Sequence, residues 1–108
     1  MLSIENKCMP HFKHVFTEPA DNALQALERD PSKKHILKAV KKSLTLMETN
    51  LRHPSLQTHE FTSLKGPAGE KVFEAYAQQN TPGAYRIFWC YGPLAGYLTI
   101  IAITPHPD

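Results

Sequence analysis

The sequence predicts an α+β fold in which helices cover one face of an antiparallel sheet. Apolar residues recur at helical spacing between residues 19 and 52, and from residue 58 onward the apolar period changes to two. Short segments rich in glycine and proline separate the alternating stretches. Helices followed by a run of hairpins are typical of α+β proteins.

The chain has 108 residues, of which 42% are hydrophobic and 20% charged, as expected for one globular domain. Residues 1–10 show no period, and we expect a loose N-terminal segment followed by a single domain over residues 11–108. No stretch approaches the roughly 18 apolar residues that a membrane helix needs. No signal-peptide pattern opens the chain, and Cys8 and Cys90 do not form a disulfide framework. The composition therefore indicates a cytoplasmic protein without a membrane partner.

Two helices are expected in the N-terminal half, after a short strand over residues 11–17. Pro19 is suited to the first turn of a helix that ends near Asp30. The pair Asp30-Pro31 is suited to start a second helix, which His53-Pro54 would stop. The apolar stripe of the second helix is Leu37, Val40, Leu44, Met47 and Leu51.

Four strands are expected in the C-terminal half. They span residues 58–64, 71–77, 84–91 and 97–104, with turns at 65–70, 78–83 and 92–96. In the third of these strands Ile87 and Trp89 share one face, and Arg86 lies on the other. If the helices cover Ile87 and Trp89, Arg86 lies on the face away from them.

An arginine in a central, aromatic-rich strand must be paired or must serve a ligand. One interpretation is a cross-strand pair between Arg86 and Glu74 that stabilises the sheet. The other is a phosphate clamp, because a guanidinium fork matches phosphate oxygens. The sequence leaves both open.

His106 is a second candidate, since histidine is suited to proton transfer near neutral pH and Pro105 and Pro107 stiffen the backbone around it. The alternative is a mobile tail. His11 and His14 have no further His or Cys partners with metal-ligand spacing, and we expect no metal site. No phosphate loop or dinucleotide fingerprint is present, so no cofactor is expected.

The net charge is +2, and the excess of basic residues lies on the second expected helix. These residues are Lys33, Lys34, Lys38, Lys41 and Lys42. They fit either a solvated helix face or a surface for nucleic acid.

Several segments, taken in order, resemble the RelE/ParE superfamily of bacterial toxins from type II toxin–antitoxin systems. They are Leu64-Lys65-Gly66, the stretches 72–76 and 84–89, and the closing residues 103–108, which end in His106-Pro107-Asp108. The most specific element is Tyr85-Arg86-Ile87, and the resemblance covers residues 11–108. It implies two N-terminal helices on one face of a small, twisted, mostly antiparallel sheet.

The resemblance also implies a chemistry. Many members of the superfamily cut mRNA on the ribosome by metal-independent attack of a ribose 2′-OH on the adjacent phosphate. On this chain, Arg86 would hold the phosphate, His106 would be the acid or base, and Glu74 and Tyr76 would complete the catalytic set. The residues implied to bind RNA are Lys65, Lys71, His59, Lys38, Lys41 and Lys42.

The implied partners are a cognate antitoxin protein, the ribosome and mRNA. Two alternatives stay open, because some branches of the superfamily inhibit DNA gyrase without cutting RNA, and a relative with this fold can be a non-toxic binding protein. A salt bridge from Glu74 that neutralises Arg86 would be the signature of the non-toxic relative.

Overall fold

The computed structural model describes residues 11–79 and 81–105. The elements, in chain order, are β1 (Lys13–Phe16), α2 (Glu18–Arg29), a 3-10 turn (Pro31–Lys33), α3 (Lys34–Thr49), a second 3-10 turn (Pro54–Leu56), β2 (His59–Lys65), β3 (Lys71–Tyr76), β4 (Tyr85–Tyr91) and β5 (Tyr97–Pro105). The four strands expected in the C-terminal half are present within one residue of their predicted bounds at each end. No helix of the described residues is long and apolar enough to span a bilayer.

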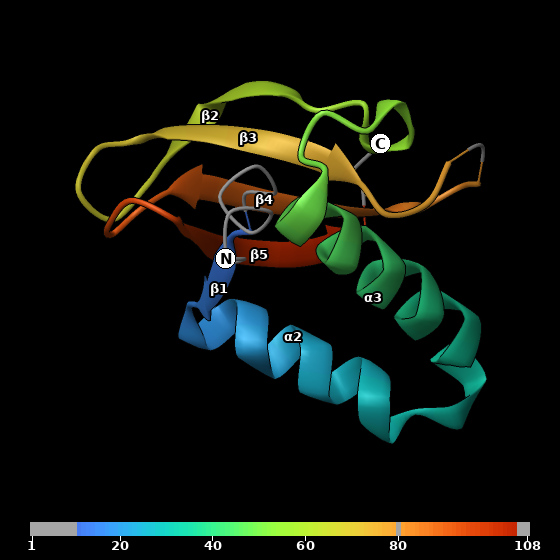
Figure 1. The fold of residues 1–108 in the computed structure, drawn as a ribbon. Helices are drawn as coiled ribbons and strands as arrows, with labels where there is room; N and C mark the ends of the chain where they lie inside the picture. The colour runs from blue at the N-terminus through green and yellow to red at the C-terminus, as the bar shows by residue number, and fades with distance from the viewer. Residues whose placement is uncertain (1–10, 80, 106–108) are drawn as a thin grey trace, which may run out of the picture.

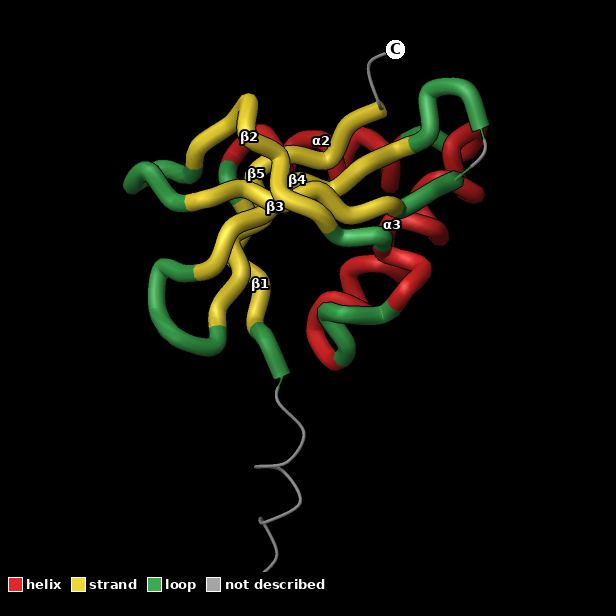
Figure 2. Tube along the Cα trace, turned by 90° about the horizontal axis from the view of Figure 1, so that it is seen from above, coloured by secondary structure: helices red, strands yellow, loops and turns green. Residues whose placement is uncertain are grey.

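The strands form one five-stranded sheet in the order β1-β5-β4-β3-β2. The pairs β2–β3, β3–β4 and β4–β5 are antiparallel, and β1 pairs with β5 in parallel. Helices α2 and α3 lie together on one face of this twisted sheet (Figures 1 and 2). The predicted α+β architecture is therefore confirmed, including its mostly antiparallel sheet.

Thr17 connects the start of α2 to the sheet. Its side-chain oxygen accepts a hydrogen bond from the Ala20 backbone N–H at 3.3 Å, and its hydroxyl donates to the Ile101 carbonyl at 2.8 Å. Glu18 and Asp21 lie in the first turn, where negative charge stabilises a helix N-terminus. One side chain thus caps α2 and positions it over β5.

The second helix is shorter than the sequence pattern predicts. Asp30 does act as a cap, accepting from the Ser32 N–H at 3.0 Å, but the turn it caps is 3-10, and the α-helix begins at Lys34. The helix also ends earlier, at Thr49, because Asn50 adopts an extended φ of −148°. Leu51 therefore follows α3, although its side chain still packs on the core.

The core lies between the two helices and the sheet. Val40 and Met47 of α3 meet Ile87, Trp89 and Ile100 of the sheet, and none of the five is more than 1% exposed. Ile87 and Trp89 therefore face the helices, as the alternation in β4 predicts. Arg86 is consequently on the opposite face, which we call the open face.

His14 links β1 to α3. Its Nδ1 lies 3.7 Å from Oε2 of Glu48, and its side chain is 8% exposed. Burial lowers the pKa of His14 below its usual 6.5, and the Glu48 carboxylate offsets only part of that effect. The folded chain thus binds this proton less readily than the unfolded chain does.

We expect this histidine to make the fold acid-sensitive. As pH falls through about 6.5 the unfolded chain takes up the proton first, so the free energy of unfolding drops. The stability of wild type should decrease more steeply between about pH 7.5 and 5 than that of His14→Asn, as measured by urea unfolding. His35→Asn, at an exposed position of α3, is the matched control and should keep the wild-type slope. Equal slopes in wild type and His14→Asn would contradict the assignment.

Candidate functional site

Four side chains from three adjacent strands meet on the open face. They are His59 of β2, Glu74 and Tyr76 of β3, and Arg86 of β4, and we call them the polar cluster. In the ladders His59 is directly opposite Glu74, and Tyr76 is directly opposite Arg86. All four were among the residues predicted from the sequence.

Glu74 is the centre of the cluster. Its side chain is 5% exposed, and its Oε1 lies 2.7 Å from Nε2 of His59. Its other oxygen, Oε2, lies 3.7 Å from Nε of Arg86. One buried carboxylate therefore joins the solvent-facing edge strand to the central strand.

Arg86 is enclosed on several sides. Its guanidinium carbon lies 3.7 Å from the centre of the Tyr76 ring, a cation–π geometry. Its Nη1 donates to the carbonyl of Gln78 at 2.9 Å. Its buried Nε has no hydrogen-bond partner among residues 11–79 and 81–105. The predicted pair with Glu74 is thus present, and Arg86 still keeps a donor that this pairing does not use.

His59 is the most exposed member of the cluster, with 48% of its side chain exposed. Its Nδ1 lies 2.9 Å from the carbonyl oxygen of Gln57, which can only accept. The Glu74 carboxyl offers a second oxygen on the other side of the ring, so both ring nitrogens of His59 face oxygen atoms. The pair His59–Glu74 therefore places an imidazole and a carboxyl within proton-transfer distance of each other at the protein surface.

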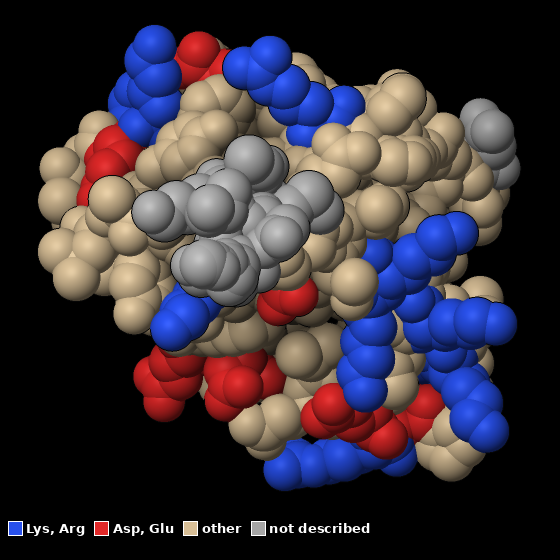
Figure 3. Space-filling view, in the orientation of Figure 1, with Lys and Arg blue, Asp and Glu red and all other residues tan. Residues whose placement is uncertain are grey.

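The remaining predicted residues lie farther from the cluster. Lys65 and Lys71 are opposite each other at the turn end of the β2–β3 ladder, at the other end of the ladder from His59 and Glu74. Lys41 of α3 lies 3.6 Å from Glu28, and the lysines of α3 form a basic surface on the helix side of the molecule (Figure 3). His106 lies outside the described residues. The last described residue, Pro105, is opposite Tyr85, next to Arg86.

Lys42 of α3 lines a cavity beside the end of β3, on the helix side of the sheet. This cavity of about 320 Å³ lies between α3 and the end of β3, and both Lys42 and Tyr76 line it. Gln79 lines it too, and its amide donates to the Ser55 carbonyl at 2.8 Å. The backbone carbonyls of Gln57 and Gln78 contact His59 and Arg86. Sequence analysis could not find these contacts, because every residue type has a backbone carbonyl.

The open face beyond the cluster is apolar. Phe61 of β2 packs on Phe88 of β4 with ring centres 4.8 Å apart, and Cys90 is buried. Burial raises the pKa of the Cys90 thiol, which keeps it protonated and poorly nucleophilic. Within the described ranges no group of three or more His, Cys, Asp or Glu side chains is placed to hold a metal ion.

Solved structures with the same arrangement of helices and strands are bacterial and archaeal toxins. The YoeB/ParE toxin from Agrobacterium tumefaciens matches with a TM-score of 0.60 and 13% identity, over 89% of this chain and 100% of the toxin. The chain has the RelE/ParE toxin fold. YoeB from Staphylococcus aureus, described as a dimer, matches with a TM-score of 0.59 and 12% identity, over 90% of this chain and 99% of the other.

The archaeal RelE of the RelE–RelB complex from Pyrococcus horikoshii matches this RelE/ParE fold with a TM-score of 0.60 and 14% identity, over 88% of this chain and 94% of the other. No protein-family model matches this sequence, and no curated protein matches it. The resemblance seen in the sequence is therefore confirmed at the level of the fold.

The ion pair at the centre of the cluster can be tested by a double-mutant cycle. Glu74→Gln leaves the buried Arg86 guanidinium without its counter-charge. Arg86→Met leaves the buried Glu74 carboxylate without the guanidinium. We expect each single change to lower the free energy of unfolding by roughly 3–5 kcal/mol, and the double change to cost clearly less than their sum. Urea unfolding of the four proteins measures the coupling.

The exposed pair Lys41–Glu28 is the matched control, because its side chains are 56% and 44% exposed. Its coupling should stay within about 1 kcal/mol, as is usual for surface ion pairs. If the Glu74–Arg86 coupling is no larger than that of the surface pair, the buried pair does not hold the cluster together.

Proposed function

We propose that this chain is the toxin of a type II toxin–antitoxin system and that it cuts RNA by metal-independent 2′-OH attack on the adjacent phosphate. The three similar structures are toxins of the same fold, which supports the first part. The second part is supported by one observation, the His59–Glu74 pair, in which an imidazole and a carboxyl lie 2.7 Å apart beside the Arg86 guanidinium.

The reaction needs a proton acceptor, a proton donor and positive charge. In the step that we propose, the 2′ oxygen forms a bond to phosphorus while the bond from phosphorus to the 5′ oxygen breaks. The 2′-OH proton passes to the His59–Glu74 pair, and the leaving 5′ oxygen receives a proton from the same pair or from His106. The products are a 2′,3′-cyclic phosphate and a 5′-OH end.

Arg86 and Tyr76 support this step from the buried side. The guanidinium neutralises negative charge that develops on the phosphate, and the Tyr76 ring holds it in position through the 3.7 Å contact. Glu74 orients His59 and keeps Arg86 paired before the substrate arrives. This extends the expectation from the sequence, in which His59 was only an RNA-binding residue.

The partners that we propose are mRNA, the ribosome and a cognate antitoxin. The Pyrococcus horikoshii neighbour was solved as a RelE–RelB complex, which supports a protein partner for this chain as well. The lysines of α3, of which Lys38 and Lys42 are exposed, would contact ribosomal RNA.

One observation favours a second candidate function. Oε2 of Glu74 lies 3.7 Å from Nε of Arg86, so the carboxylate already neutralises part of the guanidinium charge. A non-toxic binding protein of the same fold would use Arg86 in this way, as a charge that stabilises the sheet.

A short induced pulse in bacterial cells, with genome-wide mapping of new RNA 5′ ends, separates these functions. We expect wild type to arrest growth and to create 5′-OH ends within translated codons. His59→Gln, at a half-exposed position that tolerates substitution, should reduce those ends by about a hundredfold. Arg86→Lys, which keeps the charge and loses the fork, should also reduce them strongly.

His35→Gln, an exposed histidine on α3, is the matched control and should behave as wild type. Undiminished cleavage by soluble His59→Gln would remove His59 from the mechanism. Growth arrest without new ends would favour a toxin that does not cut RNA, such as an inhibitor of DNA gyrase. Normal growth with abundant soluble protein would favour the non-toxic relative.

A further inference from the structure

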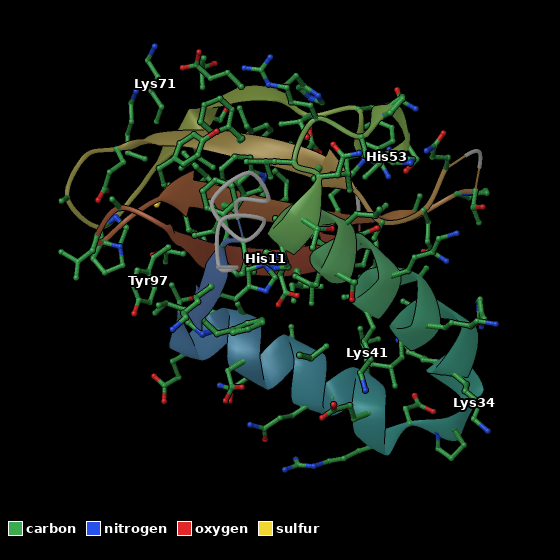
Figure 4. The ribbon with its side chains drawn as sticks, viewed as in Figure 1. His11, Lys34, Lys41, His53, Lys71 and Tyr97 are labelled. Atoms are coloured by element: carbon green, nitrogen blue, oxygen red, sulfur yellow. The ribbon has the colours of Figure 1, made fainter. Side chains whose placement is uncertain are left out.

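A second, larger cavity lies on the helix side of the sheet and takes no part in the chemistry described so far. Its volume is about 390 Å³, within the range of roughly 300–1,000 Å³ typical of sites for small organic groups. It lies where the segment after α3 meets β3 and β4, near His53 (Figure 4). Its walls come from Leu51–Pro54, Gln57, Thr58, Phe73, Trp89 and Tyr91.

The β3–β4 wall of this cavity is aromatic. Phe73 and Trp89 stack with ring centres 4.9 Å apart and planes inclined by 28°. Tyr91 meets the edge of Trp89 at 5.0 Å and is itself 51% exposed. The exposed aromatic surface in the wall is therefore that of Tyr91, which is accessible to a flat ligand.

The same wall contains a donor without an acceptor. Trp89 is 1% exposed, and its indole Nε1 is buried with no hydrogen-bond partner within residues 11–79 and 81–105. A buried N–H in this state costs free energy that a ligand oxygen or nitrogen would recover. Three exposed polar residues lie at the rim of the cavity, namely Arg52, Gln57 and Thr58.

The cavity is next to the polar cluster along the chain. Gln57 and Thr58 line the cavity, and the next residue is His59. The Gln57 carbonyl accepts from Nδ1 of His59 at 2.9 Å, so one short segment contributes to both places. Neighbouring residues of a strand are about 3.3 Å apart. An extended ligand that crosses the edge strand β2 would pass from one place to the other.

We propose that this cavity holds the base of an RNA nucleotide next to the phosphate that is cleaved, an inference that rests on the proposed function for its RNA strand. Proteins recognise single-stranded RNA by stacking bases on aromatic rings and by hydrogen bonds to base edges. Tyr91 supplies the stacking surface, the Trp89 N–H pairs with an acceptor on the base, and Arg52 contacts the adjoining phosphate. An aliphatic side chain of a protein partner would fill the volume but leave the indole N–H without an acceptor.

The chain contains a single tryptophan, so one indole N–H signal in a ¹⁵N-labelled sample reports on this cavity alone. The probes are a mixed-sequence tetranucleotide with 2′-O-methyl riboses, which cannot be cleaved, the four ribonucleoside 5′-monophosphates, and ribose 5-phosphate. We expect the tetranucleotide to shift the Trp89 signal saturably. The monophosphates should produce the same shift at higher concentration, and ribose 5-phosphate should produce none.

Two pairs of variants test the contacts. Tyr91→Leu should weaken tetranucleotide binding at least about fivefold, because it removes a stacking partner. Arg52→Ala should weaken it several-fold, whereas Arg29→Ala, an exposed arginine at the end of α2, should leave it unchanged. Unchanged circular dichroism spectra would confirm that the variants are folded.

These outcomes test base binding in the cavity independently of the catalytic proposal, because binding is measured without cleavage. A tetranucleotide that shifts Trp89 supports the base site even if the chain never cuts RNA. A Trp89 signal that none of the RNA probes moves overturns the base site, even if cleavage is observed in cells. Binding of monophosphates but not of the tetranucleotide also overturns it, since the cavity would then serve free nucleotides.

Discussion

The arrangement of the open face depends on the buried carboxylate of Glu74. A carboxylate that is 5% exposed needs polar partners, and this one has the Arg86 guanidinium on the central strand and the His59 imidazole on the edge strand. These two contacts set the position of the imidazole at the surface and of the guanidinium beneath it. The Tyr76 ring then covers Arg86, so the electrostatic demand of one residue organises the side chains of three strands.

The sheet separates this chemistry from the core by strand alternation alone. Ile87 and Trp89 pack under the helices, whereas Arg86 and Phe88 of the same strand lie on the open face. The entry to the edge strand β2 is the exception to this separation, because Gln57 and Thr58 line the aromatic cavity on the helix side and the next residue, His59, belongs to the open face. That position makes β2 the natural crossing point for an extended ligand.

Much of the fold follows from local pattern. The four C-terminal strands and their turns were predictable because alternation and glycine–proline punctuation are strong there, and α2 because Pro19 is suited to a first helical turn and apolar residues follow at helical spacing. The bounds of α3 were not predictable, since its apolar spacing continues to Leu51 while the chain has already left the helix at Asn50. Whether a 3-10 turn or an α-helix follows Asp30-Pro31 also depends on backbone hydrogen bonds, and the residue types do not indicate which of the two forms.

The sequence by itself determined which residues share the open face, because side chains alternate along a strand whatever surrounds it. It therefore singled out Arg86 and Glu74, and the resemblance added His59 and Tyr76. Only the tertiary structure decided the register that places His59 against Glu74 and Tyr76 against Arg86, because pairing depends on contacts between strands far apart in the chain. It also decided that the segment from Leu51 to Thr58, which has no strong pattern, closes an aromatic cavity with β3 and β4.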